Sequence, residues 1–269
     1  MTFLTSKPMS RARLKPVAIP AEHGGWGFLL EPLLLGLLVA PSWGGIWLAV
    51  STVGVFLMRP PLKIALTDRR RRRYERTLLA ERFVLLYGSM AVLGLGAAVL
   101  AAGADILLPL VIAAPAGMIQ VIYDVRSDSR HWLPEVAGPA ALGSAATGIA
   151  LAGGWPTTAA FALWPIILAR AIPSVLYVRA YLRLAKGGSP SLSLPLLAQA
   201  TGIGAVLALT LAGLTPVLAV VALVILLLRA IIRLSGFRRP TAPRVIGFQE
   251  IGFGIMTVVL TAAGYAAGI

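Results

Sequence analysis

The sequence predicts an all-α, polytopic membrane protein with about nine transmembrane helices, and three observations support this prediction. Of the 269 residues, 58% are hydrophobic, and the mean hydropathy is +0.86. Only 13% of the residues are charged, whereas about a quarter is usual in soluble domains. Apolar stretches of roughly 18 residues, the length that a bilayer-spanning helix needs, recur along the whole chain.

The loops that follow the apolar segments show where each segment ends. The first ends at APSWGG, the second before RPPLK, the third at AAGAD and the fourth before the basic stretch YDVRSDSR. The fifth ends at AGGWPTT, the sixth before a basic loop, the seventh at AGLTP and the eighth before the last basic loop. The nine segments are residues 24–40, 43–58, 79–102, 106–123, 134–152, 157–181, 193–212, 215–233 and 246–267.

The basic residues alternate along the chain and predict its orientation. The loops after the odd-numbered segments contain no Lys or Arg, whereas the N-terminal tail and the other loops contain nearly all of them. Loops rich in Lys and Arg stay in the cytoplasm. We therefore expect a multi-pass protein of the bacterial cytoplasmic (inner) membrane, with the N-terminus in the cytoplasm and the C-terminus outside.

No polar block is large enough for a separate soluble domain, so residues 22–269 are expected to form a single helical transmembrane domain. Residues 1–21 form a basic cytoplasmic tail without the compact apolar region of a signal peptide. The net charge of +14 follows from the basic loops, so the expected partner is the lipid bilayer and not nucleic acid. Cysteine is absent, which excludes disulfides, thiolate nucleophiles and cysteine-bound metals.

Several polar side chains lie within or close to the cytoplasmic half of the predicted spans, where contact with lipid would be costly. Arg170 lies near the middle of the sixth segment and Glu31 inside the first. The economical arrangement is one polar chamber that opens to the cytoplasmic side. Its candidate lining residues are Glu22, His23, Glu31, Arg59, Lys63, Tyr123, Asp124, Glu135, Arg170, Tyr177, Arg229, Arg233, Gln249 and Glu250.

Simpler roles exist for some of these residues. Glu22 and His23 suit an interfacial helix cap, and Glu31 suits an ion pair with Arg170, which also has Glu250 as a candidate partner. The five-residue arginine run 69–73 suits a topology anchor.

Two kinds of i,i+4 pairs suggest an anion or a metal. Arg59 with Lys63, and Arg229 with Arg233, each place two cations on one helical face, where a nearby anion would relieve their repulsion. Asp124 and Asp128 have the same spacing and suit Mg²⁺ held through oxygen ligands and phosphate. Alternatively, these aspartates pair with Arg126 and Arg130 on an exposed loop.

Four blocks of the sequence resemble the YwiC-like family of bacterial multi-pass membrane proteins. They are PAEHGGWGFLLEPLLLGLL, RPPLKIALTDRRRRRYERTLLAER, RAIPSVLYVRAYLR and GFQEIGFG, and they extend over almost the whole chain. The family resemblance implies a membrane protein but no particular reaction.

The chain is more distantly similar to the UbiA-type intramembrane prenyltransferases. YDVRSDSRHWLPEVAG resembles their loop after the fourth helix, with Tyr123, Arg130, Pro134, Glu135 and Gly138 at the matching positions. This resemblance implies nine helices, a cytoplasm-side chamber, a prenyl diphosphate substrate and Mg²⁺.

The chain departs from that family in its Asp-rich motifs, which hold Mg²⁺ after the second and sixth helices. After the second segment this chain has only Asp68, and after the sixth it has arginines instead of carboxylates. A cationic clamp that neutralises phosphate directly is therefore expected to replace the two-metal clamp.

The sequence thus predicts a chamber that binds an anionic amphiphile, a prenyl or lipid phosphate, and the leading hypothesis is transfer of its prenyl or lipid group. The (di)phosphate would contact Arg59, Lys63, Arg170 and Arg179, with Tyr123, Arg130, Glu135, Tyr177, Gln249 and Glu250 completing the site. Glu31, or Glu22 with His23, would position or deprotonate the acceptor, and Asp68 or Asp124 with Asp128 would hold Mg²⁺. The competing hypothesis is a non-catalytic transporter, carrier or assembly factor for an anionic lipid or metabolite.

Overall fold

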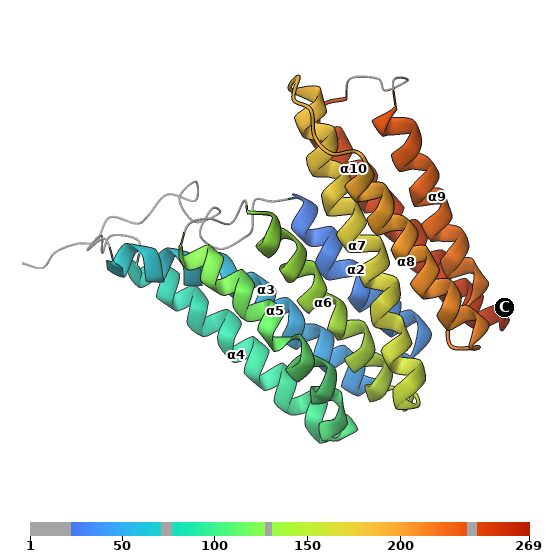
Figure 1. Cartoon of the computed structure of the whole chain (residues 1–269). Coiled ribbons are helices and arrows are strands. Elements are labelled where there is room, and N and C mark those ends of the chain that lie inside the picture. The colour runs from blue at the N-terminus through green and yellow to red at the C-terminus, as the bar shows by residue number, and fades with distance from the viewer. Residues whose placement is uncertain (1–22, 71–76, 127–130, 236–240) are drawn as a thin grey trace, which may run out of the picture.

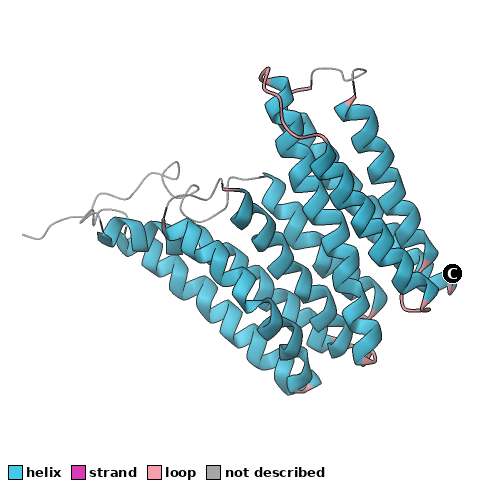
Figure 2. Ribbon diagram, in the orientation of Figure 1, coloured by secondary structure: helices cyan, strands magenta, loops and turns pink. Residues whose placement is uncertain are grey.

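The structure, a computed structural model, describes residues 23–70, 77–126, 131–235 and 241–269, all of them helices and their connections (Figures 1 and 2). These residues form nine α-helices and one short 3-10 helix, η1 (Ala104–Ile106). The α-helices are α2 (His23–Val39), α3 (Trp43–Arg70), α4 (Thr77–Ala102), α5 (Leu107–Val125), α6 (Trp132–Ala152), α7 (Thr157–Ala185), α8 (Ser193–Leu211), α9 (Val217–Leu234) and α10 (Pro243–Ala267). The prediction of an all-α fold with about nine helices is confirmed.

The helices run back and forth along one bundle, so that successive connections alternate between its two ends (Figure 1). At the end where α2 begins, the chain also connects α3 to α4, α5 to α6, α7 to α8 and α9 to α10. We call it the basic end, because Arg69, Arg126, Arg183, Lys186 and Arg244 lie there in the described residues. The connections at the opposite end contain no Lys or Arg, as the alternating loop pattern predicted.

One boundary was predicted too early. Hydropathy falls at Arg59, so the second segment was expected to end at residue 58, but α3 continues to Arg70. It does so through Pro60 and Pro61, which cannot donate backbone hydrogen bonds to the preceding turn. Hydropathy marks where a helix leaves the apolar layer, which is not where its backbone stops being helical.

Helix α6 lies at the centre of the bundle. α6 packs against α2, α3, α5 and α7, and α2 also contacts α10 (Figure 1). The α6 stretch Gly143–Ala150 is buried throughout and consists almost entirely of small residues. Small side chains let neighbouring helix backbones approach closely inside a membrane. α6 therefore holds α2 and α7 close together, which sets the spacing of the site described below.

Among the described residues, seven helices are long and apolar enough to cross a membrane: α3, α4, η1 with α5, α7, α8, α9 and α10. Of the remaining two, α2 has a shorter apolar stretch, Gly25–Val39. α6 is not among the seven, and its central position explains why, since a helix covered by protein does not need lipid-compatible side chains.

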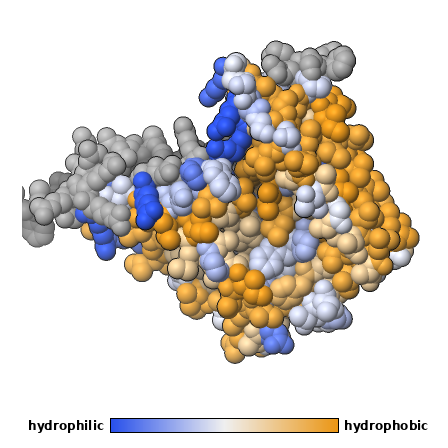
Figure 3. All heavy atoms as spheres, in the orientation of Figure 1, coloured by the Kyte–Doolittle hydropathy of each residue, from blue (hydrophilic) through white to orange (hydrophobic). Residues whose placement is uncertain are grey.

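The outer helices expose large apolar side chains to their surroundings. On α4, Leu85, Val92, Leu93 and Leu100 are all mostly exposed. Hydrophobic atoms cover most of the face in Figure 3, and hydrophilic ones gather beside a hollow at the basic end. A soluble monomer rarely exposes so much contiguous apolar surface, so the chain is an integral membrane protein.

Candidate functional site

A cavity of about 780 Å³ lies inside the bundle, and we call it the chamber. Residues of α2, α3, α5, α6, α7 and α10 line it, and the lining reaches the exposed Arg183 and Lys186 at the basic end. Much of its wall is apolar, including Phe28, Phe56, Pro134, Pro139, Leu142, Val175, Val178, Leu182 and Ile251. The chamber therefore combines a hydrocarbon-compatible wall with charged side chains.

The most deeply buried charges of the chamber are Glu31 of α2 and Arg170 of α7. Their exposed fractions are 4% and 1%, and Nε of Arg170 lies 2.9 Å from Oε2 of Glu31. Nη2 of Arg170 also donates to the carbonyl oxygen of Glu250 at 2.6 Å, and the guanidinium lies 5.5 Å from the ring of Phe28. The two intramembrane charges singled out from the sequence thus neutralise each other.

Helix α10 approaches this pair through Gly254. A Cβ atom at position 254 would lie 2.0 Å from Oε1 of Glu31 and 2.9 Å from Nη2 of Arg170. No side chain larger than hydrogen fits there unless the ion pair moves. Gly254 is the last glycine of the block GFQEIGFG, so the block has a packing function that its sequence alone did not show.

A second buried pair lies beside the first and links α9 to α10. Arg229 forms an ion pair with Glu250, and its guanidinium lies 4.2 Å from the ring of Tyr177 and 4.8 Å from that of Phe253. A cation over an aromatic face is attracted by the ring quadrupole. Tyr177 therefore contacts the charge network although it does not line the chamber.

Several buried polar atoms of these two pairs have no hydrogen-bond partner in the described part of the chain. They include Oε1 of Glu31, Nη1 of Arg170, Oγ of the neighbouring Ser174 and Oε2 of Glu250. Burying a polar atom without a partner costs about 1–3 kcal/mol. Glu31, Arg170, Ser174 and Glu250 all line the chamber, so a ligand or water there is the candidate partner of these atoms.

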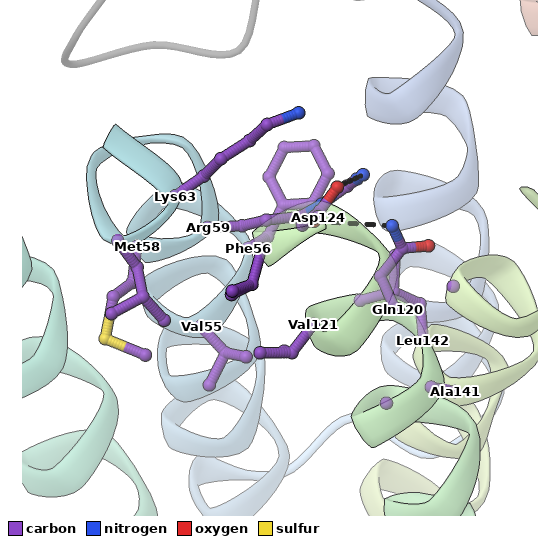
Figure 4. A pocket seen from close by; sticks show the side chains of 14 residues that line it. Val55, Phe56, Met58, Arg59, Lys63, Gln120, Val121, Asp124, Ala141 and Leu142 are labelled. Atoms are coloured by element: carbon purple, nitrogen blue, oxygen red, sulfur yellow. Dashed lines mark hydrogen bonds and ion pairs between the residues drawn. The ribbon is translucent and has the colours of Figure 1, made fainter. Parts of the chain in front are cut away.

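Elsewhere in the chamber wall, α3 contributes Arg59 and α5 contributes Gln120, and Asp124 of α5 lies next to both (Figure 4). Arg59 donates two hydrogen bonds to the carboxylate of Asp124. Its Nε donates to Oδ2, and its Nη2 donates to Oδ1 at 3.0 Å. With its amide oriented so that donors meet acceptors, Gln120 accepts from Arg59 at 2.6 Å and donates to the carbonyl of Pro134. These contacts tie α3, α5 and α6 together beside the chamber.

A fourth pair lies nearer the basic end, where Arg179 of α7 donates a hydrogen bond to Glu135 of α6. Arg183 and Lys186, farther along α7, also line the chamber but take part in none of the five ion pairs among the described residues. We call the opening of the chamber at the basic end its mouth, and its cations Arg183 and Lys186 therefore have no carboxylate partner in the part of the chain that the structure describes.

The structure brings together many of the residues predicted from the sequence. Six of them line the chamber: Glu31, Arg59, Glu135, Arg170, Arg179 and Glu250. Lys63 and Asp124 line a smaller cavity next to it, and Tyr177 packs on Arg229 as described.

Other predicted residues lie elsewhere. Tyr123 stacks on His131, with ring centroids 5.2 Å apart, while the half-buried Gln249 and Asp68 line neither cavity. His23 begins α2. Glu22, Asp128 and Arg130 fall outside the described residues.

Two expectations about pairing can be compared with the ion pairs of the structure. The i,i+4 cations were expected to have an anion nearby, and for Arg59 and Arg229 a carboxylate of the protein itself lies there, that of Asp124 and Glu250 respectively. For Asp124 the sequence suggested Mg²⁺ or Arg126 and Arg130, and the structure shows an ion pair with Arg59 of α3. Both ion pairs join helices distant in sequence, which residue spacing cannot reveal.

Sequence reasoning missed Gln120, Ser174 and Lys186, whereas Arg183 is one of the arginines noted after the sixth segment. Gln120 carried a signal, because it is a polar residue in an apolar helix, four positions before Asp124 and on the same face. Within the described residues, no group of three or more His, Asp or Glu side chains is arranged to hold a metal ion. The carboxylate of Asp124 is already engaged by Arg59.

Comparison with known proteins finds a family similarity in the N-terminal half of the chain. No curated protein and no solved structure matches the sequence. The model of the family described as YwiC-like protein matches residues 19–147, which include α2 to α5, most of α6, and the chamber residues Glu31 and Arg59. Over these residues the chain is similar to the YwiC-like family, as its sequence blocks indicated.

Proposed function

We propose that the chamber binds an anionic amphiphile, a prenyl or lipid phosphate, with its head group at the mouth. One observation carries the proposal: a cavity of about 780 Å³ has a largely apolar wall and ends at Arg183 and Lys186. A hydrocarbon chain suits such a wall, and a phosphate suits cations that have no carboxylate partner among the described residues.

The charge balance of the chamber supports this placement of the head group. Arg59, Arg170 and Arg179 each have a carboxylate partner, so a phosphate beside them would have to displace that partner or share it. Arg183 and Lys186 need no such exchange. The proposed head-group position is therefore closer to the basic end than the position expected from the sequence, which was beside Arg59, Lys63, Arg170 and Arg179.

The basic end is proposed to face the cytoplasm, because Lys and Arg are retained on that side of bacterial membranes. A reporter enzyme fused after Ile269, which lies at the opposite end, is then expected to be active only outside the cytoplasm. A cytoplasmic signal from this fusion would reverse the orientation of the chamber.

The enzymatic form of the proposal is transfer of the prenyl or lipid group to an acceptor. The bond between carbon and the phosphate oxygen would break, and the electron pair would leave with the (di)phosphate, stabilised by the cations. The acceptor would form the new bond to that carbon, and Glu31 would take its proton. Glu31 is suited to this role because it lines the chamber and one of its oxygens has no partner in the described structure.

Transport is the second candidate, and the helix that carries Arg170 favours it. Pro165 and Pro173 interrupt the backbone hydrogen bonds of α7 on either side of Arg170, and transporters often place interrupted helices at their binding sites. In sealed vesicles, movement of an unaltered compound would indicate transport, whereas a new covalent product would indicate transfer.

Replacing both Arg183 and Lys186 with alanine is expected to weaken the binding of farnesyl phosphate in detergent. Each cation near a membrane surface contributes about 1 kcal/mol toward an anion, so the double variant should bind roughly 30-fold more weakly. Isothermal titration calorimetry would measure this change. EDTA should leave wild-type binding intact, because arginine and lysine neutralise phosphate without a metal.

The matched control is Arg244→Ala, since Arg244 is also exposed at the basic end but does not line the chamber. It should bind like the wild type. An equal loss of affinity for farnesyl phosphate in the control and the double variant would show that only the overall positive charge of the basic end matters. Loss of binding in EDTA would instead indicate a metal-held phosphate.

A further inference from the structure

A second, smaller cavity of about 150 Å³ lies between α3, α5 and α6, and we call it the side cavity (Figure 4). Its wall is mainly apolar, and Val55, Met58 and Leu62 of α3 face Val121 and Val125 of α5 across it. An apolar cavity of about this volume is large enough to hold a molecule such as benzene. The side cavity thus has room for a short piece of hydrocarbon chain.

The side cavity and the chamber have a common wall. Phe56, Arg59, Gln120, Gly138 and Leu142 line both of them. A Cβ atom on Gly138 would lie 2.5 Å from the side-chain amide of Gln120, so this wall depends on a residue without a side chain. A ligand in the chamber lies one layer of side chains away from the side cavity.

The other face of the side cavity is turned toward the surroundings of the bundle. Val55 is 51% exposed and Val121 is 43% exposed, although both line the cavity. Figure 4 shows their side chains directed toward each other from neighbouring helices. In an integral membrane protein, apolar residues exposed within the spans face hydrocarbon.

The two ends of the side cavity differ in polarity. Arg59, Lys63, Gln120 and Asp124 lie on one side of it, while Val55, Val121 and Ala141 lie on the other (Figure 4). The polarity of the cavity wall thus changes from charged to apolar along its length. The polarity of an amphiphile changes in the same direction when its head group lies toward the basic end. A wholly polar ligand would leave the apolar side unused.

We propose that the side cavity holds the distal part of the amphiphile's hydrocarbon chain and leads it between α3 and α5 to the bilayer. This inference rests on the proposed function and adds where the chain goes. The chamber holds the head group and the proximal chain, and the hydrocarbon passes through the common wall formed by Phe56, Arg59, Gln120, Gly138 and Leu142. A long chain then ends in lipid, so the protein accepts chains longer than the chamber.

The test compares chain-length dependence in two glycine variants. Gly117 lines the side cavity, and a Cβ there would meet only Ala141, at 3.9 Å. Gly117→Leu therefore fills the side cavity without disturbing the backbone. The matched control is Gly96→Leu on α4, where a Cβ meets nothing within 4 Å and which lines neither cavity.

Binding of geranyl phosphate and of geranylgeranyl phosphate, whose chain is twice as long, would be measured for all three proteins. The wild type and Gly96→Leu are expected to bind the longer compound more tightly. Gly117→Leu should bind the shorter compound normally and the longer one roughly tenfold or more weakly, because several methylene groups lose their burial.

Two results would overturn the inference. In the first, Gly117→Leu keeps the chain-length preference of the wild type. In the second, its affinity for both compounds falls by the same factor. Either result would show that the hydrocarbon chain does not use the side cavity. If the wild type binds neither compound, the proposed function itself fails, and this outcome is distinct from the first two.

A second variant tests the opening between α3 and α5 directly. The chain has no cysteine, so Val55→Cys with Val121→Cys can be joined by a short bis-maleimide. Joining them is expected to weaken binding of geranylgeranyl phosphate but not of geranyl phosphate, relative to the same variant before reaction. Unchanged binding of the longer compound would show that its chain leaves by another route.

Discussion

Replacing Arg170 with methionine is expected to lower the free energy of unfolding by about 3–5 kcal/mol, which is the usual cost of leaving a buried charge without its partner. The charge left behind is that of Glu31, which is 4% exposed and 2.9 Å from Arg170. The carbonyl of Glu250 would also lose the donor that now lies at 2.6 Å. Unfolding in increasing concentrations of sodium dodecyl sulfate would measure the loss.

A variant without both charges separates two contributions to the lost free energy of unfolding. One comes from the unpaired carboxylate, and the other comes from poorer packing of the new side chain. In Glu31→Met with Arg170→Met, no charge stays unpaired, and apolar replacement of a whole buried pair is often close to neutral. The double variant should therefore be more stable than Arg170→Met alone. Arg183→Ala is the control for loss of a cation, because Arg183 is exposed, and it should unfold like the wild type. A single variant as stable as the wild type would contradict the pairing.

Gly254→Ala is expected to lower the free energy of unfolding nearly as much as Arg170→Met does, although it adds only a methyl group. The new Cβ would lie 2.0 Å from Oε1 and 2.4 Å from Cδ of Glu31. The carboxylate cannot yield without leaving Arg170, and Arg170 also lies within 2.9 Å of the new atom. Overpacking of a core typically costs about 1–3 kcal/mol, and displacement of the ion pair adds to it.

A double-mutant cycle checks this cause. In a Glu31→Ala background the obstructing carboxylate is gone, so Gly254→Ala should cost much less there than in the wild type. The control Gly252→Ala lies on the same helix, and its Cβ would meet nothing within 4 Å; it should have little effect. Equal costs of Gly254→Ala in both backgrounds would mean that it acts through the helix backbone and not through Glu31.

The helices could be predicted from the sequence because hydropathy and loop charge report directly on the bilayer. Every predicted segment corresponds to a helix, and the glycine-rich and basic loops gave most boundaries within a few residues. The exception, the continuation of α3 to Arg70, lies beyond the apolar layer, where hydropathy no longer distinguishes a helix from a loop.

The gathering of charges could also be predicted, because a lone charge in hydrocarbon is expensive and must face protein or water. That argument selected Glu31 and Arg170, and both line the chamber. It could not determine most partners, because each cation had several carboxylates within the reach allowed by topology. The pairing of Arg59 with Asp124 depends on how α3 lies against α5, which no local pattern records.

The mouth of the chamber could not be predicted for a different reason. Arg183 and Lys186 look like ordinary topology anchors in the sequence. What distinguishes them is that they line the chamber while the other lining cations have carboxylate partners. Such a difference is a property of the assembled site and not of any segment.

The central claim, that the chamber holds an anionic amphiphile, is tested most directly by native mass spectrometry of what the purified protein retains. Gly247 lines the chamber and Gly252 does not, and a Cβ at either position would meet nothing within 4 Å. Gly247→Phe thus fills the chamber, while Gly252→Phe adds the same ring elsewhere on α10. The wild type and Gly252→Phe should retain a phosphate-bearing lipid that Gly247→Phe loses. An equal amount of the same lipid on all three proteins, or none on the wild type even after incubation with farnesyl phosphate, would contradict the claim.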